Sequence, residues 1–413
     1  MTDQDQGADG DRLTTREAAE RLGVKPETVY AYVSRGQLGS RRDPGGRGST
    51  FDAGEVDALV RRGRRQAAAG GDGTPVVRTG ITLIDKDRYY FRGVDATELA
   101  RRHHYEEIAD WLWTGTLERG IRFTAPPEPL AAARRAVDAL PAHSGSTDRL
   151  RVAAIAAAAA DPLRFDLSPS AVTGVGRMLI PTLVDALPVV GTAHGGEDRL
   201  ARRLWSRLTA REPEEPSLRA LDLALSLLID HDLAASTLAV RVAASARAHP
   251  YAVVSAGLGA LDGPLHGAAS GLAHRMLAEV LERGSAAPVV ADHLRAGRRV
   301  PGLGHRLYPA RDPRAEALFG ALAEIPDARP SLEAAREVEA TAAGQTDLHA
   351  NVDLALAALS VSAGMAAEAG ETVFAVARTA GWIAHALEEY EERPLRMRPS
   401  GRYNGPRPPR PLP

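Results

Sequence analysis

The sequence predicts a mainly α-helical protein, in which a large helical region follows a small N-terminal unit of three helices. Beyond residue 91, alanine and leucine recur at helical spacing with Pro or Gly at the breaks, most clearly over 218–230, 233–248 and 372–389. The sequence has no strand–helix alternation and no phosphate-binding glycine fingerprint, which argues against a Rossmann or P-loop fold. With 413 residues, 44% of them hydrophobic, the chain has room for several domains and a large core.

Composition restricts the partners of the chain. The formal net charge is −2, so any surface that binds nucleic acid must be local. The absence of cysteine excludes disulfides and thiolate chemistry. The opening segment, residues 1–6, is acidic and polar, unlike a secretory signal. No uncharged apolar run approaches the roughly 20 residues that span a bilayer. We therefore expect a cytoplasmic protein.

Residues 13–65 are expected to form a compact unit after a polar tail at 1–12. Thr14 and Glu17 have capping-box spacing, which predicts a helix that begins directly after Thr14. A glycine-containing break follows, and Pro26 is then well placed as the first residue of a second helix.

A basic loop separates the second helix from a third, which Asp52 can cap. The loop is flanked by glycines and carries Arg41, Arg42 and Arg47. Residues 11–66 contain 12 Lys/Arg against 8 Asp/Glu, a local excess of 4 in a chain that is slightly acidic overall. Helix, tight turn, helix, basic loop and helix form the layout of a helix-turn-helix with a small wing.

The segment LTTREAAERLGV, residues 13–24, resembles the opening of the excisionase and MerR-like DNA-binding families. The resemblance implies that residues 28–33 form the recognition helix, so that Thr28, Tyr30 and the wing arginines would contact duplex DNA. The alternative is a helix-turn-helix that binds protein or only packs on its neighbour.

The remaining boundaries follow from residue composition. Residues 66–77 are rich in small residues and are expected to form a linker. Residues 81–91 predict a short hairpin. A large helical region is expected over 78–405, followed by a Pro/Arg-rich extended tail at 406–413.

Three short motifs carry candidate chemistry. His266 lies in GPLHG, His305 lies in PGLGHR ahead of a DPR sequence, and Asp353 ends NVD. Two histidines and one carboxylate can supply a base, an acid and a neutral hydrogen-bond donor. This set suits carbon–carbon bond formation beside a carbonyl, where a proton leaves carbon and another reaches oxygen.

The order of these motifs resembles the citrate synthase family over roughly residues 78–405. The motifs are preceded by IDHDLAASTLAVR, residues 229–241, and followed by FAVARTAGWIAH, residues 374–385. The resemblance implies a large helical domain and a smaller one, at roughly 230–340, with a cleft between them that closes on substrate.

The resemblance assigns three catalytic roles. Asp353 would remove an α-proton from a thioester, although a helix N-cap is its alternative role. His266 follows a Gly-Pro turn and would stay neutral near a helix start, donating to the enolate oxygen. Its alternative role is a hydrogen-bonded structural histidine. His305 would bind and protonate the carbonyl oxygen of the acceptor.

The resemblance also assigns contacts to a dicarboxylate 2-oxo acid. Arg314 and Arg378 would clamp carboxylates in bidentate fashion, with His231 and Phe374 beside them. Arg393 would complete the site of a second subunit, which implies a homodimer or a higher homo-oligomer.

Coenzyme A contacts are expected at Arg306, Gly302 and Gly304, since glycines let backbone approach a ligand. Two departures from the family lie near this side of the site. Residues 344–350 lack the basic residue that the family often has there, and residues 354–356 replace an aromatic and a serine.

Together these residues imply an acyltransferase of the tricarboxylic acid cycle that condenses acetyl-CoA with oxaloacetate and releases citrate and coenzyme A. The thioester is a substrate, and neither a cofactor nor a metal is expected. A 2-methylcitrate synthase using propionyl-CoA is an alternative, because room for one methyl group is worth only about 1–3 kcal/mol. A DNA-binding regulator with a ligand-sensing domain is another. Retention of His266, His305 and Asp353 argues against it, since a sensor needs no base.

Overall fold

The computed structural model describes residues 12–22, 24, 26–34, 38–42, 48–57, 59, 77–263, 266–308, 310–343, 348–399 and 403–405. Arg47 lies outside the described residues, as do the expected tail at 406–413, residues 1–11 of the expected tail at 1–12, and residues 66–76 of the expected linker at 66–77. The chain divides into two compact units, the first ending at Arg78 and the second beginning at Thr79.

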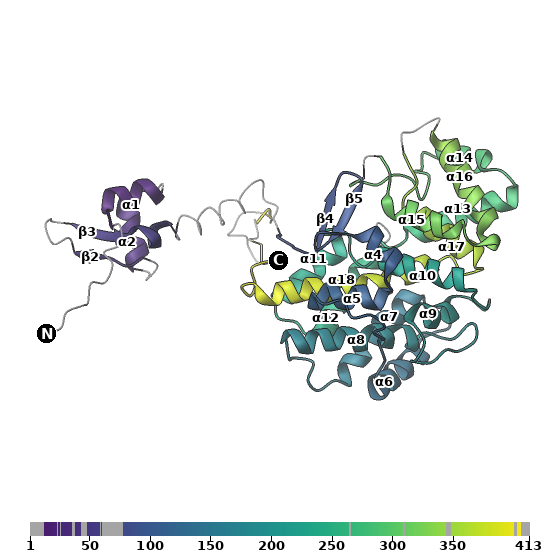
Figure 1. The fold of residues 1–413 in the computed structure, drawn as a ribbon, viewed down its shortest axis with the longest axis horizontal. Coiled ribbons are helices and arrows are strands. Elements are labelled where there is room, and N and C mark those ends of the chain that lie inside the picture. The colour runs from purple at the N-terminus through teal and green to yellow at the C-terminus, as the bar shows by residue number, and fades with distance from the viewer. Residues whose placement is uncertain are drawn as a thin grey trace, which may run out of the picture. The chain divides into compact units, whose positions relative to one another are not determined.

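The first unit has the elements of a winged helix-turn-helix (Figure 1). Its elements are β1 (Arg12–Thr14), α1 (Thr15–Leu22), α2 (Pro26–Ser34), β2 (Arg41–Arg42) and β3 (Ser49–Asp52), and residues 53–57 are again helical. The three strands form an antiparallel sheet in the order β1-β3-β2. Ala18, Val29 and Phe51 are buried together between the helices and the sheet.

Local hydrogen bonds explain why the helices of this unit begin where they do. The backbone N–H of Thr14 donates to the Glu17 carboxylate at 2.8 Å, and the Glu17 N–H donates to Thr14 Oγ1 at 3.3 Å. The predicted capping box is therefore confirmed. Pro26 is the first residue of α2, and Asp52 accepts from the N–H of Glu55 at 2.9 Å.

The second unit opens with a small antiparallel sheet and continues as helices. The sheet consists of β4 (Thr82–Asp85), β5 (Arg88–Phe91) and β6 (Val94–Asp95). The predicted hairpin is confirmed, with Thr82 paired to Phe91 and Asp85 to Arg88.

The helices of the second unit vary in length from a single 3₁₀ turn to 23 residues. They are α4 (Ala96–Arg102), α5 (Tyr105–Thr114), α6 (Pro127–Asp138), α7 (Ser146–Ala159), α8 (Pro169–Ala186), α9 (Leu200–Leu208), α10 (Glu215–Leu227), α11 (Ala235–Ser245), α12 (Pro250–Leu261), α13 (Ala269–Arg283), α14 (Ala286–Arg295), α15 (Pro313–Leu322), the 3₁₀ helix η1 (Pro326–Ala328), α16 (Arg329–Ala343), α17 (Val352–Ser362) and α18 (Ala369–Glu391). The predicted mainly helical fold is confirmed.

Figure 1 shows α13, α14, α16 and α17 gathered on one side of this unit, and α6, α7, α8 and α12 on the other. Helices α11 and α12, which fall within the expected smaller domain, pack against α18, and α12 also packs against α7. Helix α18 contacts helices of both groups. At Gly381, α18 lies against the backbone of Ile229, where an added Cβ would be 2.1 Å from the carbonyl oxygen. This close approach places α18 directly against the segment that leads to His231.

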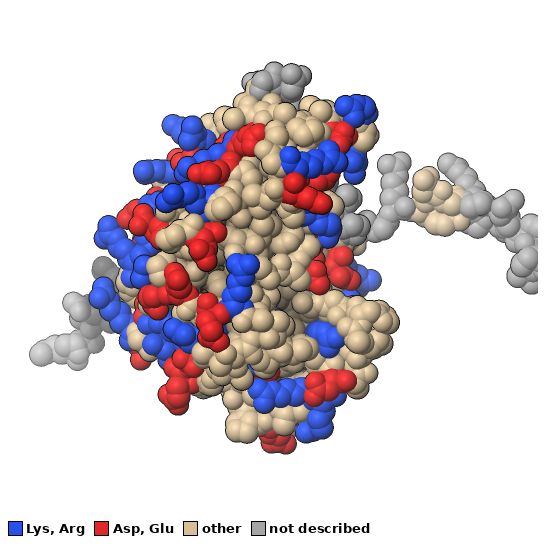
Figure 2. Space-filling view, turned by 90° about the vertical axis from the view of Figure 1, so that its right-hand side faces the viewer, with Lys and Arg blue, Asp and Glu red and all other residues tan. Residues whose placement is uncertain are grey.

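Charges are interspersed on the face of the second unit that Figure 2 shows. Figure 2 shows Lys and Arg side chains alternating with Asp and Glu around a band of uncharged residues. This face therefore lacks the single-sign field that attracts nucleic acid. Among the described residues, no helix is both long enough and apolar enough to cross a membrane.

Candidate active site

A cavity of about 480 Å³ lies in the second unit, where five separate segments meet. It is lined by His231, Asp232, Leu233, Ala234, His266, Gly267, Ser270, His305, Arg306, Leu307, Arg314, Val352, Asp353, Phe374 and Arg378. The cavity therefore collects the three motif residues His266, His305 and Asp353 together with two buried arginines.

Arg378 is fixed by α18 at one wall of the cavity. Its Nε donates to the carbonyl oxygen of Leu228 at 2.9 Å, and its guanidinium lies 4.4 Å from the centre of the Phe374 ring. Burial lowers the pKa of Arg378 to about 10, although Asp230 opposes this shift. No ion pair joins Arg378 to a carboxylate in the described part of the chain. Its terminal nitrogens can therefore bind an anionic group in the cavity.

Arg314, by contrast, is already paired. Its Nε and Nη2 donate to the two oxygens of Asp312 at 2.9 and 2.8 Å, and both side chains are buried. Asp312 also accepts from the N–H of Val352 at 3.1 Å. The pair therefore attaches the start of α15 to the start of α17. The guanidinium of Arg314 lines the cavity.

His305 is held by a turn that contains two glycines with positive φ, Gly302 at 79° and Gly304 at 82°. Asn351 fastens this turn, because its N–H donates to the Gly302 carbonyl and its side chain to that of Gly304. The Nδ1 of His305 accepts from the N–H of Leu307 at 3.1 Å. The proton of the neutral ring must therefore lie on Nε2.

The histidines of the cavity favour their neutral forms. Burial, and then the charge of Arg314, lower the pKa of His305 to about 4. Burial lowers the pKa of His231 well below its usual value, and Nε2 of that ring lies 2.7 Å from the Tyr308 hydroxyl. Burial and then Arg378 lower the pKa of His266. The rings can thus donate or accept single hydrogen bonds at neutral pH without carrying charge.

His266 lies three residues before α13, and its Nε2 lies 2.8 Å from the Ser236 hydroxyl. When the hydroxyl donates to Nε2, the proton of the neutral ring is on Nδ1. The ring also contacts the edge of Phe374, with centroids 6.1 Å apart.

Asp353 occupies the second position of α17 and is not its N-cap. Asn351 is the N-cap, and its side chain accepts from the N–H of Asp353 at 2.9 Å. Among the described residues, no group donates a hydrogen bond to the Asp353 carboxylate. Burial raises the pKa of Asp353 to about 6, with Arg314 opposing the shift and Asp312 adding to it. A carboxylate in this state is a stronger base than an ordinary aspartate.

The residues expected to contact coenzyme A and the arginine expected to complete a partner's site lie in different places. Gly304 and Arg306 line a neighbouring cavity of about 560 Å³ together with Arg298 and Arg299. Arg393 lies in neither cavity; it is exposed just beyond the end of α18.

Sequence reasoning missed several partners at this site. Tyr308, which contacts His231, lies three residues after His305, between the PGLGHR and DPR motifs, so its position could have signalled a role. Ser236 was noted only as part of a motif, and its contact with His266 joins residues 30 positions apart. No periodicity or spacing marks such a pair.

The expected DNA contacts in the first unit are also located. Thr28 and Tyr30 lie on α2, and the exposed Tyr30 hydroxyl is 3.2 Å from Thr15 Oγ1. Arg41 and Arg42 form β2 and are exposed.

Comparisons with known proteins agree with the fold. The model of the citrate synthase C-terminal domain matches residues 70–400, and the chain belongs to the citrate synthase family. The citrate synthase of Haloferax volcanii is 31% identical over 360 residues, which cover 81% of this chain and 94% of that protein.

Solved structures give the same result. The crystal structure of citrate synthase from Thermotoga maritima has a TM-score of 0.66 and 27% identity, covering 83% of this chain and 96% of that one. The fold also matches Thermoplasma acidophilum citrate synthase in its ternary complex with carboxymethyl coenzyme A and oxaloacetate. The TM-score is 0.67 and the identity 24%, over 84% of this chain and 98% of that one. A helix-turn-helix domain model matches residues 12–64.

Proposed function

We propose that the protein is a citrate synthase, which condenses acetyl-CoA with oxaloacetate and water to give citrate and free coenzyme A. The observation that carries the proposal is Asp353. Its raised pKa makes it a base, and it shares one cavity with neutral histidines and buried arginines. The family match and the ligands of the Thermoplasma acidophilum complex support the choice of substrates.

Proton transfers in the reaction follow from the positions of the side chains. Asp353 removes a proton from the methyl group of acetyl-CoA, and a neutral His266 donates a hydrogen bond to the enolate oxygen. The enol carbon attacks the ketone carbon of oxaloacetate, whose oxygen receives the Nε2 proton of His305. The proton that Asp353 took from the methyl group then replaces the one that His305 gave, so both side chains return to their starting states. Water then cleaves the thioester, so that coenzyme A leaves as the thiol.

Substrate binding would use the charges around these groups. Arg378 would bind one carboxylate of oxaloacetate, and Arg314, although paired with Asp312, would attract the other. Phe374 and His231 would complete this side of the site. The arginines of the neighbouring cavity, Arg306 above all, would contact coenzyme A phosphates beside the turn at Gly302 and Gly304.

The test is release of coenzyme A thiol when acetyl-CoA and oxaloacetate are mixed with the full-length protein. We expect thiol release that requires both substrates. Faster turnover with propionyl-CoA would instead favour a 2-methylcitrate synthase. No release with either thioester would contradict the proposal and favour a ligand-sensing regulator.

We further propose a dimer as the active unit. Exposed apolar side chains gather on or near α7 and α11, which both pack on α12; they are Ile155, Leu163, Phe165, Leu238 and Val242. Arg393, which is exposed in one chain, would complete the cavity of the partner. Mixing an inactive Asp353→Ala chain with an inactive Arg393→Ala chain should restore activity after subunit exchange. Exchanged hybrids without activity would show that each chain is self-sufficient.

The winged helix-turn-helix supports a second proposal, salt-dependent binding of duplex DNA. Thr28 and Tyr30 would approach bases, and Arg41, Arg42 and Arg47 would contact phosphates. Each phosphate contact contributes about −0.9 to the slope of log K against log salt. Replacing the three arginines by alanine should therefore reduce the slope by about 2–3 units. Absence of binding at low salt would favour a protein-binding module, and would leave the synthase proposal intact.

A further inference from the structure

A second cavity, of about 240 Å³, lies in the second unit apart from the catalytic one, and the two share no lining residue. It is lined by His104, Arg122, Glu197, Asp198, Arg199, Ala201, Arg202, Glu215, Leu218, Arg219 and Asp222. Its volume is below the roughly 300–1,000 Å³ of a typical drug-sized site, so it fits a small molecule.

Four arginines converge on this cavity, but their electrostatic partners are poor. Arg199 lies 3.9 Å from Glu106 and 3.7 Å from Glu107, and its Nη1 is buried without a hydrogen-bond partner in the described part of the chain. By contrast, Arg203 in the same helix is 2.6 Å from its carboxylate partner. A buried donor without a partner destabilises the fold, and a bound acceptor would remove that cost.

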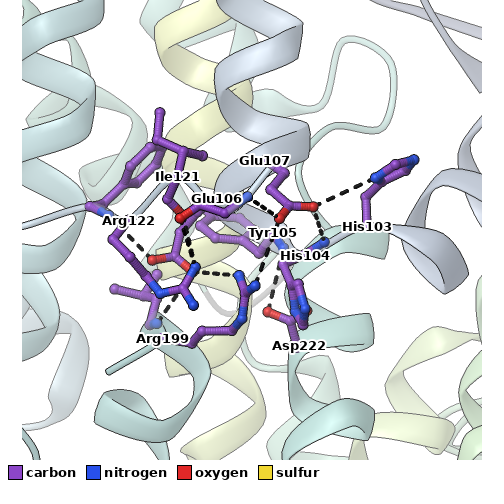
Figure 3. A network of polar contacts seen from close by, with 12 residues as sticks. His103, His104, Tyr105, Glu106, Glu107, Ile121, Arg122, Arg199 and Asp222 are labelled. Carbon is purple, nitrogen blue, oxygen red and sulfur yellow. Dashed lines mark hydrogen bonds and ion pairs between the residues drawn. The ribbon is translucent and has the colours of Figure 1, made fainter. Parts of the chain in front are cut away.

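The two glutamates that face Arg199 also accept hydrogen bonds from backbone N–H groups (Figure 3). Glu106 accepts from the N–H groups of Phe123 and Leu200 at 3.2 and 3.5 Å. Glu107 accepts from the N–H groups of Gly120 and His104 at 2.8 and 3.2 Å. These carboxylates therefore hold the surrounding backbone, and they leave the guanidinium of Arg199 incompletely bound.

Two more guanidiniums at the cavity have no carboxylate partner among the residues that the structure describes. Arg122 donates to the backbone carbonyls of Gly120 and Ile121, at 3.0 and 3.2 Å. For Arg219, the described residues provide neither an ion pair nor a side-chain hydrogen bond.

Four carboxylates line the cavity beside the four arginines, so the lining has no net formal charge. Asp222, however, lies 2.8 Å from His104, whereas Asp198 and Glu215 each lie 3.9 Å from Arg202. Glu197 is exposed. Among the described residues, Arg122 and Arg219 therefore have no carboxylate partner, and Arg199 has only distant ones.

The N-terminal ends of three helices contribute partial positive charge at the cavity. His104 and Arg199 are the N-caps of α5 and α9, and Glu215 is the first residue of α10. Three helices of 10, 9 and 13 residues thus begin at the cavity, and the N-terminal end of a helix carries partial positive charge.

We propose that this cavity binds a small ligand through a phosphate or carboxylate group held by Arg122, Arg199 and Arg219. The ligand contacts the first turns of α9 and α10 and supplies the acceptor that Nη1 of Arg199 lacks. Helix α10 runs from this cavity toward His231, so the anion site and the catalytic cavity lie at opposite ends of one helix. Binding here does not depend on the proposed synthase activity.

The test is calorimetric titration of the full-length protein with inorganic phosphate and, separately, with glutarate. The probe that binds identifies the preferred group. Removing one charged hydrogen-bond donor costs about 1.5–3 kcal/mol, so Arg219→Ala and Arg122→Ala should each weaken binding about tenfold or more. These side chains lie at the edge of the cavity, and thermal unfolding will show that both variants remain folded.

A control variant separates this site from arginines elsewhere on the surface. Arg101→Ala removes an arginine that pairs with Glu98 at an exposed position of α4. This variant should bind the probe as the unmodified protein does. The proposal is overturned if neither probe binds, or if binding survives both Arg219→Ala and Arg122→Ala.

Discussion

Asp353 in the catalytic cavity and Glu107 beside the second cavity are both carboxylates in the first turn of a helix near an arginine, yet their proton affinities shift in opposite directions. Burial raises the pKa of Asp353 to about 6. Burial also acts on Glu107, but hydrogen bonds from the N–H groups of Gly120 and His104 outweigh it and lower its pKa.

The two carboxylates differ in whether they accept hydrogen bonds from backbone N–H groups. Glu107 accepts bonds on both oxygens, at 2.8 and 3.2 Å, and so serves the fold. At the start of α17, Asn351 takes the capping role, and its amide oxygen accepts the N–H of Asp353. The Asp353 carboxylate therefore takes no part in capping the helix and can accept a proton. Because the neighbouring Asn351 caps the helix, the Asp353 carboxylate accepts no backbone hydrogen bond from the described residues and keeps a raised pKa.

The largest effect expected from this contrast is on turnover. Asp353→Asn removes the base but preserves shape and burial, so kcat for coenzyme A release should fall by about 10²–10⁴. Oxaloacetate binding, measured by calorimetry, should persist because the arginines remain. Turnover close to that of the unmodified protein would show that another group removes the proton.

Asp353→Asn should also stabilise the protein at pH 7, by up to about 3 kcal/mol. The folded-state pKa of about 6 lies above the usual 3.8, so the contribution of Asp353 is fully favourable below pH 3.8 and is lost as pH rises through 6. The asparagine variant avoids that loss. Chemical denaturation at pH 5 and 7 will check this, and an equal or lower stability of the variant at pH 7 would argue against a strained carboxylate.

Glu107→Gln should change the free energy of unfolding in the opposite direction, and by a smaller amount. Its folded-state pKa is lowered, so its contribution is present above the unfolded value of 4.5 and is lost as pH falls through the folded value. At pH 7 the variant should lose about 1–2 kcal/mol of unfolding free energy, because glutamine accepts only one of the two bonds well. Glu118→Gln, at an exposed position on the loop after α5, is the matched control and should change little.

Local features of the fold could be predicted because their partners lie a few residues apart. The capping box of Thr14 and Glu17, Pro26 at the start of α2 and the hairpin at 82–91 are examples. Each depends on backbone geometry that nearby residues determine.

Features that depend on packing could not be predicted. The helix expected over 233–248 ends at Ser245, and Arg247 has a φ of 60°. Asn351 rather than Asp353 caps α17, and Glu106 accepts hydrogen bonds from the loop residue Phe123 and from Leu200 at the start of α9. The second cavity likewise joins separate segments without any sequence motif.

The measurement that tests the central claim most directly is the pH dependence of coenzyme A release at limiting acetyl-CoA and saturating oxaloacetate. If Asp353 is the base, kcat/KM should fall below an apparent pKa near 6, because the protonated acid cannot accept the proton. The Asp353→Asn variant should lack this limb. A wild-type profile that stays flat from pH 7 to pH 5, with the protein still folded, would contradict the assignment of Asp353 as the base.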